Sequence, residues 1–269
     1  VTMEEFELAK DKVLMGAERR SIVMPENERM NTAYHESGHT VVAKVLSEYT
    51  DPVHKVTIIP RGRALGVTMQ LPEEDRYSHN REYLSARIAV LMGGRIAEEI
   101  FMEQMTTGAA NDFEHATDLA QKMVQRWGMS DRLGPRVYGD NDSEVFLGRD
   151  MVTHRNLSNA TAEEVDKEVS RIIEEQYDRA RSIIEEHRQI IETMTKNLLE
   201  WETLESDQIA QIMAGDEPRP PAPSSDGDPP TTDSDAESGG AATQKPGINL
   251  EKLFTVGEII QRISGIKAC

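Results

Sequence analysis

Cysteine is almost absent from this chain of 269 residues, because its single thiol, Cys269, occupies the last position. That thiol cannot pair within its own chain, so a fold stapled by disulfides is excluded and a reducing compartment is expected. A structural zinc site built on several cysteines is excluded for the same reason.

Positive charge and long apolar runs are also scarce. The chain has 30 Lys and Arg against 48 Asp and Glu, a formal net charge of -18. Nucleic acid and anionic membrane surfaces both require clustered positive charge, so neither is expected as the main partner. No run of ~18 apolar residues and no signal peptide occurs. We therefore expect the chain as given to be soluble, and a first residue other than Met suggests a piece of a longer protein.

The pattern HExxH stands at His35, Glu36 and His39. On a helix, residues four apart share one face with about 6 Å between their Cβ atoms, and Glu36 projects beside them. Two neutral imidazoles and one further ligand hold zinc with a position open for water, whose pKa the ion lowers. Glu36 can take the proton of that water and return it to a leaving amine, so the motif predicts a zinc hydrolase.

The surrounding sequence predicts a helix for this motif, beginning after Pro25 and continuing through apolar positions to Leu46. Gly38 lies between the two histidines, where it costs helix propensity, so we expect a neighbouring element to pack closely there. The paired Gly93 and Gly94 interrupt a second apolar stripe, at residues 80–100, and predict a close approach to the metal helix.

A small β-element follows the motif, with short strands expected at residues 55–60 and 66–71. Pro60 ends the first run, which favours an edge strand over a central one. Two interpretations remain open: a hairpin that only packs on the helices, or an edge that holds an extended peptide by strand addition. On the second interpretation the substrate-binding residues are Val56, Thr57, Ile58 and Ile59.

Helices dominate the rest of the chain. Beyond residues 80–100, a helix is expected from the loop at 106–112 to Trp127, and residues 130–156 are expected to be loop. A capping box at Thr161 predicts the start of a long amphipathic helix that runs to Ile191, and His187 marks the place where this helix can break. A last short helix at 206–213 is stopped by Gly215.

Composition divides the C-terminal part of the chain. Residues 25–215 carry the motif and the helices, and residues 216–247 are rich in Pro, Asp and Ser, which predicts a disordered linker. Residues 248–269 are apolar again at helical spacing, as expected of a docking helix or an appended segment.

The third zinc ligand is not fixed by spacing. The HExxHxxGxxH pattern is absent, because Val42 and Val45 occupy its glycine and third histidine positions. A downstream carboxylate on another helix is the physical default. The candidates by residue type are His54, His79, Glu98, Glu99, Asp112, Glu114 and His115.

Seven colinear motifs resemble the peptidase domain of the FtsH family of membrane-anchored, ATP-dependent zinc metalloproteases. They are Glu28–Met30, His35–His39, Val56–Gly62, Gly66–Thr68, Gly93–Glu99, Thr107–Asp112 and Trp127–Ser130. The resemblance covers about residues 1–213. It implies one Zn²⁺ per chain held by His35, His39 and Asp112, with Glu36 as the general base, in a mainly α, zincin-like peptidase domain with a small β-element.

The same resemblance implies partners and a location. Residues 1–24 resemble the end of the helical lid of the family's AAA module, whereas the Walker motifs and the two membrane spans are not in this sequence. ATP binding and membrane attachment are therefore expected only in segments that this chain lacks. The family implies unfolded or membrane protein substrates, a homo-hexamer, and the cytoplasmic face of the bacterial inner membrane.

Two alternatives belong to other classes of protein. One is an inactive binding or assembly module with a structural zinc, which is disfavoured because such sites usually close all four positions with Cys and His. The other is a helical adaptor in which the motif is coincidental. A metal assay on the purified protein separates the second alternative from the peptidase.

Overall fold

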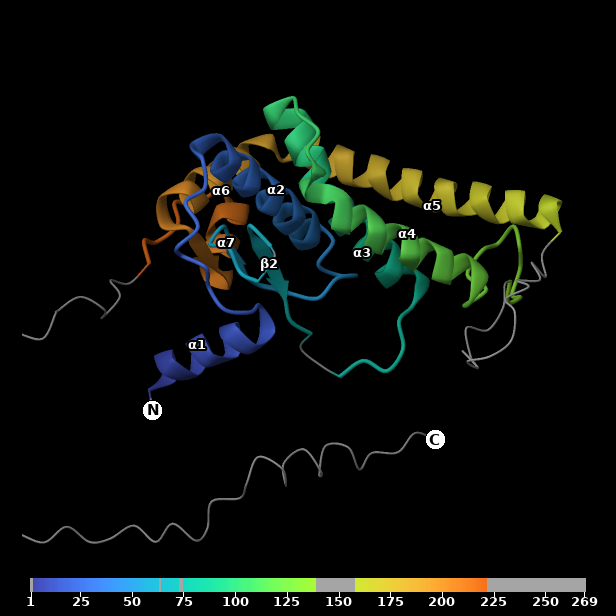
Figure 1. The fold of residues 1–269 in the computed structure, drawn as a ribbon, viewed down its shortest axis with the longest axis horizontal. Coiled ribbons are helices and arrows are strands. Elements are labelled where there is room, and N and C mark those ends of the chain that lie inside the picture. Colours follow the sequence, from blue (N-terminus) through green and yellow to red (C-terminus); the bar gives the residue numbers. More distant parts are fainter. Residues whose placement is uncertain (1, 63, 73–74, 139–157, 222–269) are drawn as a thin grey trace, which may run out of the picture. The chain divides into compact units, whose positions relative to one another are not determined.

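The structure, a computed structural model, describes residues 2–62, 64–72, 75–138 and 158–221. The expectations for residues 222–247 and 248–269, and for most of the loop at 130–156, lie outside the described residues. The described part is mainly α-helical with one small sheet, as expected (Figure 1). None of its helices combines the length and the apolar character needed to cross a membrane.

Seven helices and three strands account for most of the described residues. The helices are α1 (Met3–Leu14), α2 (Glu26–Val45), α3 (Arg81–Ala97), α4 (Ala110–Gln125), α5 (Asn159–Glu186), α6 (Arg188–Trp201) and α7 (Ser206–Ala214). The strands are β1 (Val53–Thr57), β2 (Val67–Gln70) and β3 (Thr203–Glu205), and two short turns are η1 (Glu98–Met102, π-helical) and η2 (Thr107–Ala109, 3₁₀).

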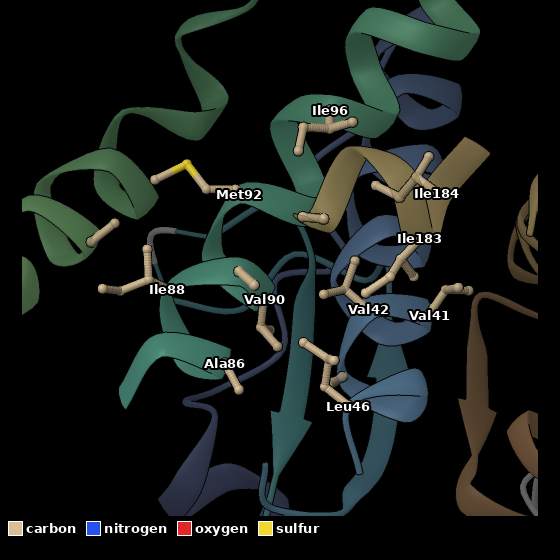
Figure 2. Packing of buried hydrophobic residues seen from close by; sticks show 14 of the residues in the cluster. Val41, Val42, Leu46, Ala86, Ile88, Val90, Met92, Ile96, Ile183 and Ile184 are labelled. Atoms are coloured by element: carbon tan, nitrogen blue, oxygen red, sulfur yellow. The ribbon is translucent and has the colours of Figure 1, made fainter. Parts of the chain in front are cut away.

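The metal helix α2 and helix α3 touch through their backbones. A Cβ atom added to Gly38 would lie 2.3 Å from the carbonyl oxygen of Gly93, and one added to Gly93 would lie 2.8 Å from the oxygen of Gly38. The close approach expected from these glycines is therefore confirmed. Figure 2 shows the core around it, where Val42 of α2, Ile96 of α3 and Ile184 of α5 are fully buried.

The sheet corrects one expectation. Its order is β2-β1-β3, so β1 is the central strand and not an edge. Residues 55–57 pair with β2 on one side and with β3 on the other, and the amide of Ile58 donates to the oxygen of Glu202 at 2.9 Å. Pro60 lies beyond this ladder, so its missing N–H costs no sheet hydrogen bond. The substrate-binding assignment therefore loses its basis at four buried residues: Val56, Thr57, Ile58 and Ile59.

The two outer strands of the described sheet are β2 and β3, and β2 is the one whose Thr68 contacts α2. Strand β2 pairs with β1 alone, from Val67 opposite Thr57 to Gln70 opposite Val53. An open edge of this kind carries backbone N–H and C=O groups that can pair with another extended chain.

Helix boundaries in the second half agree with the sequence at two places and differ at two: the cap of α5, and the end of α6, which lies at Trp201 and not at Ile191. The break near His187 is confirmed, because α5 ends before it and α6 begins after it. Gly215 ends α7 with φ +81°, as its position predicted. The capping box at Thr161 is wrong: the N-cap is Ser158, whose side chain accepts a hydrogen bond from the Thr161 amide at 3.2 Å. Ser158 has the extended backbone that an N-cap requires, so the helix begins one turn earlier.

The long apolar stripes of α3 and α5 are covered within the chain. Helix α3 packs on α2 and α5, and stripe residues such as Ile88, Met92 and Ile172 are buried. These stripes are therefore part of the core of the chain. Several large apolar side chains on α1 remain exposed: Met3, Phe6, Leu8, Val13 and Leu14.

Candidate metal centre

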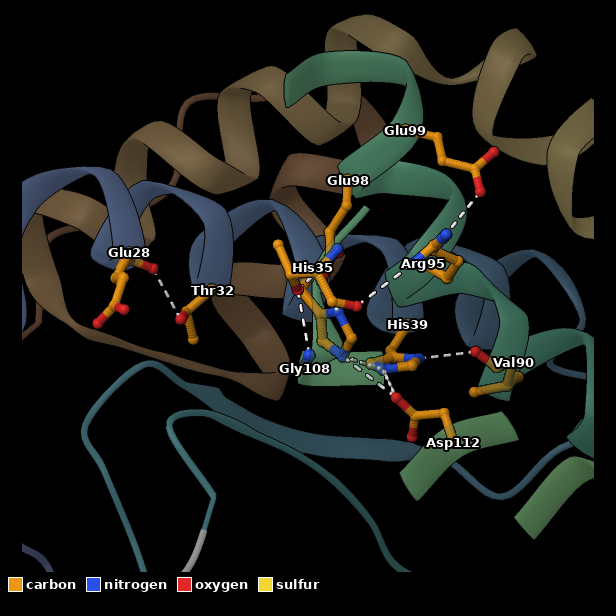
Figure 3. Close-up of polar contacts among 11 residues, drawn as sticks. Glu28, Thr32, His35, His39, Val90, Arg95, Glu98, Glu99, Gly108 and Asp112 are labelled. Carbon is orange, nitrogen blue, oxygen red and sulfur yellow. Dashed lines mark hydrogen bonds and ion pairs between the residues drawn. The ribbon is translucent and has the colours of Figure 1, made fainter. Parts of the chain in front are cut away.

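Three side chains from two helices converge at one point (Figure 3). Helix α2 places Nε2 of His35 3.0 Å from Nε2 of His39. The first turn of α4 contributes Asp112, whose Oδ2 lies 3.3 Å from Nε2 of His35 and 3.6 Å from that of His39. The structure thus brings together the two motif histidines and one of the seven candidate third ligands.

The hydrogen bonds of the His35 and His39 rings show which ring nitrogens carry a proton and which have a free lone pair. Nδ1 of His39 lies 2.7 Å from the carbonyl oxygen of Val90, which can only accept, so Nδ1 carries the proton. Nδ1 of His35 lies 2.8 Å from Oε1 of Glu98, a carboxylate that favours the same tautomer. Both Nε2 atoms are then acceptors, and Asp112 adds an acceptor oxygen. Three acceptors this close together are stabilised by a shared positive charge, which a proton on His35 or a bound metal ion can supply.

The spacing of these atoms fits zinc. Zinc bonds of about 2.0–2.1 Å in tetrahedral directions place two ligand atoms about 3.3 Å apart. The three observed separations are 3.0, 3.3 and 3.6 Å. The set of two imidazoles and one carboxylate is also the type found in catalytic zinc sites that keep a position open for water.

The electrostatics of the site favour positive charge. Burial lowers the pKa of His35, but the carboxylates of Asp112 and Glu98 oppose it more strongly and raise that pKa to about 10. Burial raises the pKa of Asp112, but the hydrogen bonds of His35 and His39 outweigh it and hold that pKa well below its usual range. Metal ligands must be deprotonated, so a bound ion takes the place of the proton on His35.

Glu98 reaches the other side of His35. It is 1% exposed on the π-helical turn η1, and its Oε2 accepts from the backbone amide of Thr106 at 3.2 Å and its hydroxyl at 3.0 Å. Burial raises the pKa of Glu98, while His35 and Thr106 lower it more, so the net shift is downward. Glu98 therefore fixes the orientation of His35 from Nδ1 and leaves Nε2 to the metal.

The other third-ligand candidates have different partners or face solvent. Glu99 accepts from the Tyr177 hydroxyl at 2.6 Å and from Arg181 at 2.8 Å. His54 contacts Lys10, and His79 stacks on Tyr83. The exposed candidates on α4 are Glu114 and His115.

Glycine 94 makes room for the two rings. A Cβ atom there would lie 2.6 Å from Nε2 of His39 and 2.6 Å from Cε1 of His35. The sequence indicated that the glycine pair approaches the metal helix, but only the structure shows that Gly94 lies against the ligand atoms themselves.

Glu36 lies under strand β2. It is 6% exposed, and its Oε2 accepts a hydrogen bond of 2.7 Å from the hydroxyl of Thr68 on β2. Sequence reasoning missed Thr68, although its place two residues after Gly66 in an alternating strand puts both on one face. The general-base candidate thus has a defined partner outside its own helix.

Comparison with known proteins agrees with this geometry. The sequence model of Peptidase family M41 matches residues 22–212. The ATP-dependent zinc metalloprotease FtsH of Magnetococcus marinus is 55% identical over 216 residues, which cover 80% of this chain and 32% of that protein. The protein of the same name from Acidobacterium capsulatum is 51% identical over 233 residues, covering 87% and 36%. The chain therefore spans about a third of the length of these curated relatives.

Proposed function

Because the chain belongs to peptidase family M41, we propose that it is a zinc-dependent endopeptidase domain that hydrolyses extended polypeptide. The observation that carries this proposal is the convergence of three acceptor atoms, from His35, His39 and Asp112. Glu36 follows His35 on the same helix, α2. The cofactor is zinc, and these three residues would hold it.

The chemistry divides between the ion and the chain. Zinc, when bound, supplies a Lewis acid for the scissile carbonyl and lowers the pKa of water. Glu36 accepts a proton from the attacking water, the water oxygen bonds to the carbonyl carbon, and the C–N bond breaks. Glu36 then delivers the proton to the leaving nitrogen, so the products are a carboxylate and an amine.

The edge of β2 is the surface that we assign to the substrate backbone, in place of residues 56–59. Its Thr68 contacts Glu36, so a peptide added to this edge would run beside the general base. Backbone pairing of this kind requires an extended substrate, which is consistent with unfolded polypeptide as the substrate class.

The activity of the longer relatives is proposed for this chain only in part. The relatives are named ATP-dependent, and we propose that this chain is the peptidase part of such a protein, with ATP binding in segments that it does not contain. Family resemblance also supplies the homo-hexamer, membrane protein substrates and the cytoplasmic face of the bacterial inner membrane.

The test combines metal content with cleavage. The purified chain should carry one zinc, cut unfolded casein, lose activity to a chelator and regain it with added zinc. Glu36→Gln should keep the zinc and the fold but cut about 10²- to 10⁴-fold more slowly, because an amide of the same shape cannot accept the water proton. Near-normal turnover of this variant would remove Glu36 from the mechanism, and a wild-type chain without metal would overturn the proposal.

A further inference from the structure

We propose that Thr68 is a positioning residue that holds the Glu36 carboxylate in its working orientation, an inference that rests on the proposed role of Glu36 as general base. Among the described residues, the Thr68 hydroxyl is the only group hydrogen-bonded to that carboxylate, at 2.7 Å from Oε2. A contact from another element is the means by which a flexible side chain is kept in one rotamer.

The hydroxyl proton of Thr68 is best donated to the Glu36 carboxylate. Three oxygens surround its Oγ1: Glu36 Oε2 at 2.7 Å, the Glu36 carbonyl oxygen at 3.3 Å and the Thr40 hydroxyl at 3.4 Å. The carboxylate oxygen is the closest and the only charged one, so it receives the stronger, charge-assisted bond. The Glu36 carbonyl is already served by the Thr40 hydroxyl at 2.8 Å.

Gly66 lies beside the other oxygen, Oε1, of the same carboxylate. A Cβ atom on this buried glycine would lie 2.7 Å from Cγ and 2.8 Å from Oε1 of Glu36. Gly66 directly precedes β2 and is two residues from Thr68, and both residues lie against Glu36 of α2. Thr68 therefore binds Oε2, while the bare backbone at Gly66 leaves Oε1 without a hydrogen bond from the described residues and open to accept a proton.

The strand that carries Thr68 is held independently of the metal ligands. Thr68 pairs with Val56 of the central strand β1, and β1 is paired in turn with β3. The position of the hydroxyl is thus set by the sheet, and the loss of this hydroxyl should disturb Glu36 without disturbing His35, His39 or Asp112.

The variants are chosen to separate the hydroxyl from the shape of the side chain. Thr68→Val removes the hydroxyl and keeps the branched shape, whereas Thr68→Ser keeps the hydroxyl. Thr40→Val is the matched control, because it removes a neighbouring hydroxyl that donates to the main-chain oxygen of Glu36 and has only a long contact, 3.4 Å, with Thr68. Glu36→Gln and the double variant with Thr68→Val complete a cycle.

We expect kcat on an unstructured fluorogenic peptide to fall about 10- to 100-fold in Thr68→Val, since small misplacements of a reacting group cost that much. KM and the zinc content should not change, and Thr68→Ser and Thr40→Val should stay near wild type. In the Glu36→Gln background, Thr68→Val should have no further effect. Wild-type kcat in Thr68→Val, an equal loss in Thr68→Ser, or a rise in KM alone would each overturn the proposal.

A readout that is independent of activity separates this proposal from the proposed function. In crystal structures of the zinc-loaded protein, Oε2 of Glu36 should lie within hydrogen-bond distance of residue 68 in the wild type and Thr68→Ser. It should leave that position, or occupy more than one rotamer, in Thr68→Val. An unmoved carboxylate in Thr68→Val overturns the positioning role, whereas a wild-type chain that holds Glu36 in place but cuts nothing overturns only the proposed function.

Discussion

Oε1 of Glu98 lies 2.8 Å from Nδ1 of His35, while Oδ2 of Asp112 lies 3.3 Å from Nε2 of the same ring. The two carboxylates thus contact different nitrogens of one imidazole ring. Two acidic residues that residue type alone did not rank as third ligand thus differ in the structure: Glu98 orients the ring, and Asp112 completes the group that could hold a metal ion.

Replacement of these two residues should have different effects on zinc. Asp112→Ala should lose most of the bound zinc, because it removes a ligand atom. Glu98→Gln should bind zinc about 10- to 100-fold more weakly yet still fill at saturation, since it changes only the orientation of His35. Competition with a chromophoric chelator measures both. Full metal content in Asp112→Ala, together with its loss in Glu98→Ala, would show that Glu98 is the ligand.

Gly38→Ala should destabilise the whole domain. The new methyl group would lie 2.3 Å from the Gly93 carbonyl, so α2 and α3 must move apart. Overpacking of this kind costs about 1–3 kcal/mol, and we expect the upper end because the obstacle is backbone. Urea unfolding of the zinc-loaded protein measures the loss. Ser170→Ala, at an exposed helical position on α5, is the control and should change stability by less than about 0.5 kcal/mol.

Gly94→Ala should act on the metal site first. Its methyl group would lie 2.6 Å from Nε2 of His39, the atom that must face the ion. We expect zinc affinity to fall more than in Gly38→Ala, whose clash lies away from the ligand atoms. Equal zinc affinity in Gly94→Ala and the wild type, measured with the same chelator, would contradict the close approach at this residue.

Truncation should separate residues that contact the domain from those that do not. Arg219 accepts from Gln208 at 2.8 Å and donates to Gln211 at 2.9 Å, so the contacts continue past the boundary at 215 expected from the sequence. Ending the chain after Gly215 should cost about 1–2 kcal/mol for two lost hydrogen bonds. Ending it after Pro221 should leave stability and activity unchanged, because the Pro-rich and Asp-rich composition beyond it buries little. A fall of many degrees in Tm from the second truncation would show that residues 248–269 dock.

The assembly and the substrate range make a fifth set of expectations. By family resemblance, the chain alone should form a hexamer, which light scattering would detect, and a monomer at micromolar concentration would contradict it. Without ATP-driven unfolding, the chain should cut a destabilised mutant of a test domain and spare the folded parent. A fold stable by about 5–15 kcal/mol exposes too small an unfolded fraction for rapid cleavage. ATP-stimulated cleavage of the folded parent by this chain would overturn this expectation.

Features that depend on neighbours along the chain follow from the amino-acid sequence alone. His35 and His39 share a helix face because they are four residues apart, and Glu36 stands beside them for the same reason. The break at His187 and the end of α7 at Gly215 follow from local periodicity and backbone freedom. The cap predicted at Thr161 is wrong because Ser158 and Thr161 are both good capping residues, and the choice between them depends on backbone angles that composition does not give.

Features that join distant segments depend on tertiary packing and do not follow from local sequence. β1 is central because β3 arrives from Thr203–Glu205, roughly 150 residues later, and no local pattern around Pro60 carries that pairing. Asp112 faces Nε2 of His35, and Glu98 faces Nδ1, because the turn η1 and the start of α4 approach α2 from different sides. Thr68 meets Glu36 for the same kind of reason. The sequence gives the chemical type of each side chain. Its partner depends on how elements that are distant in the sequence pack against one another.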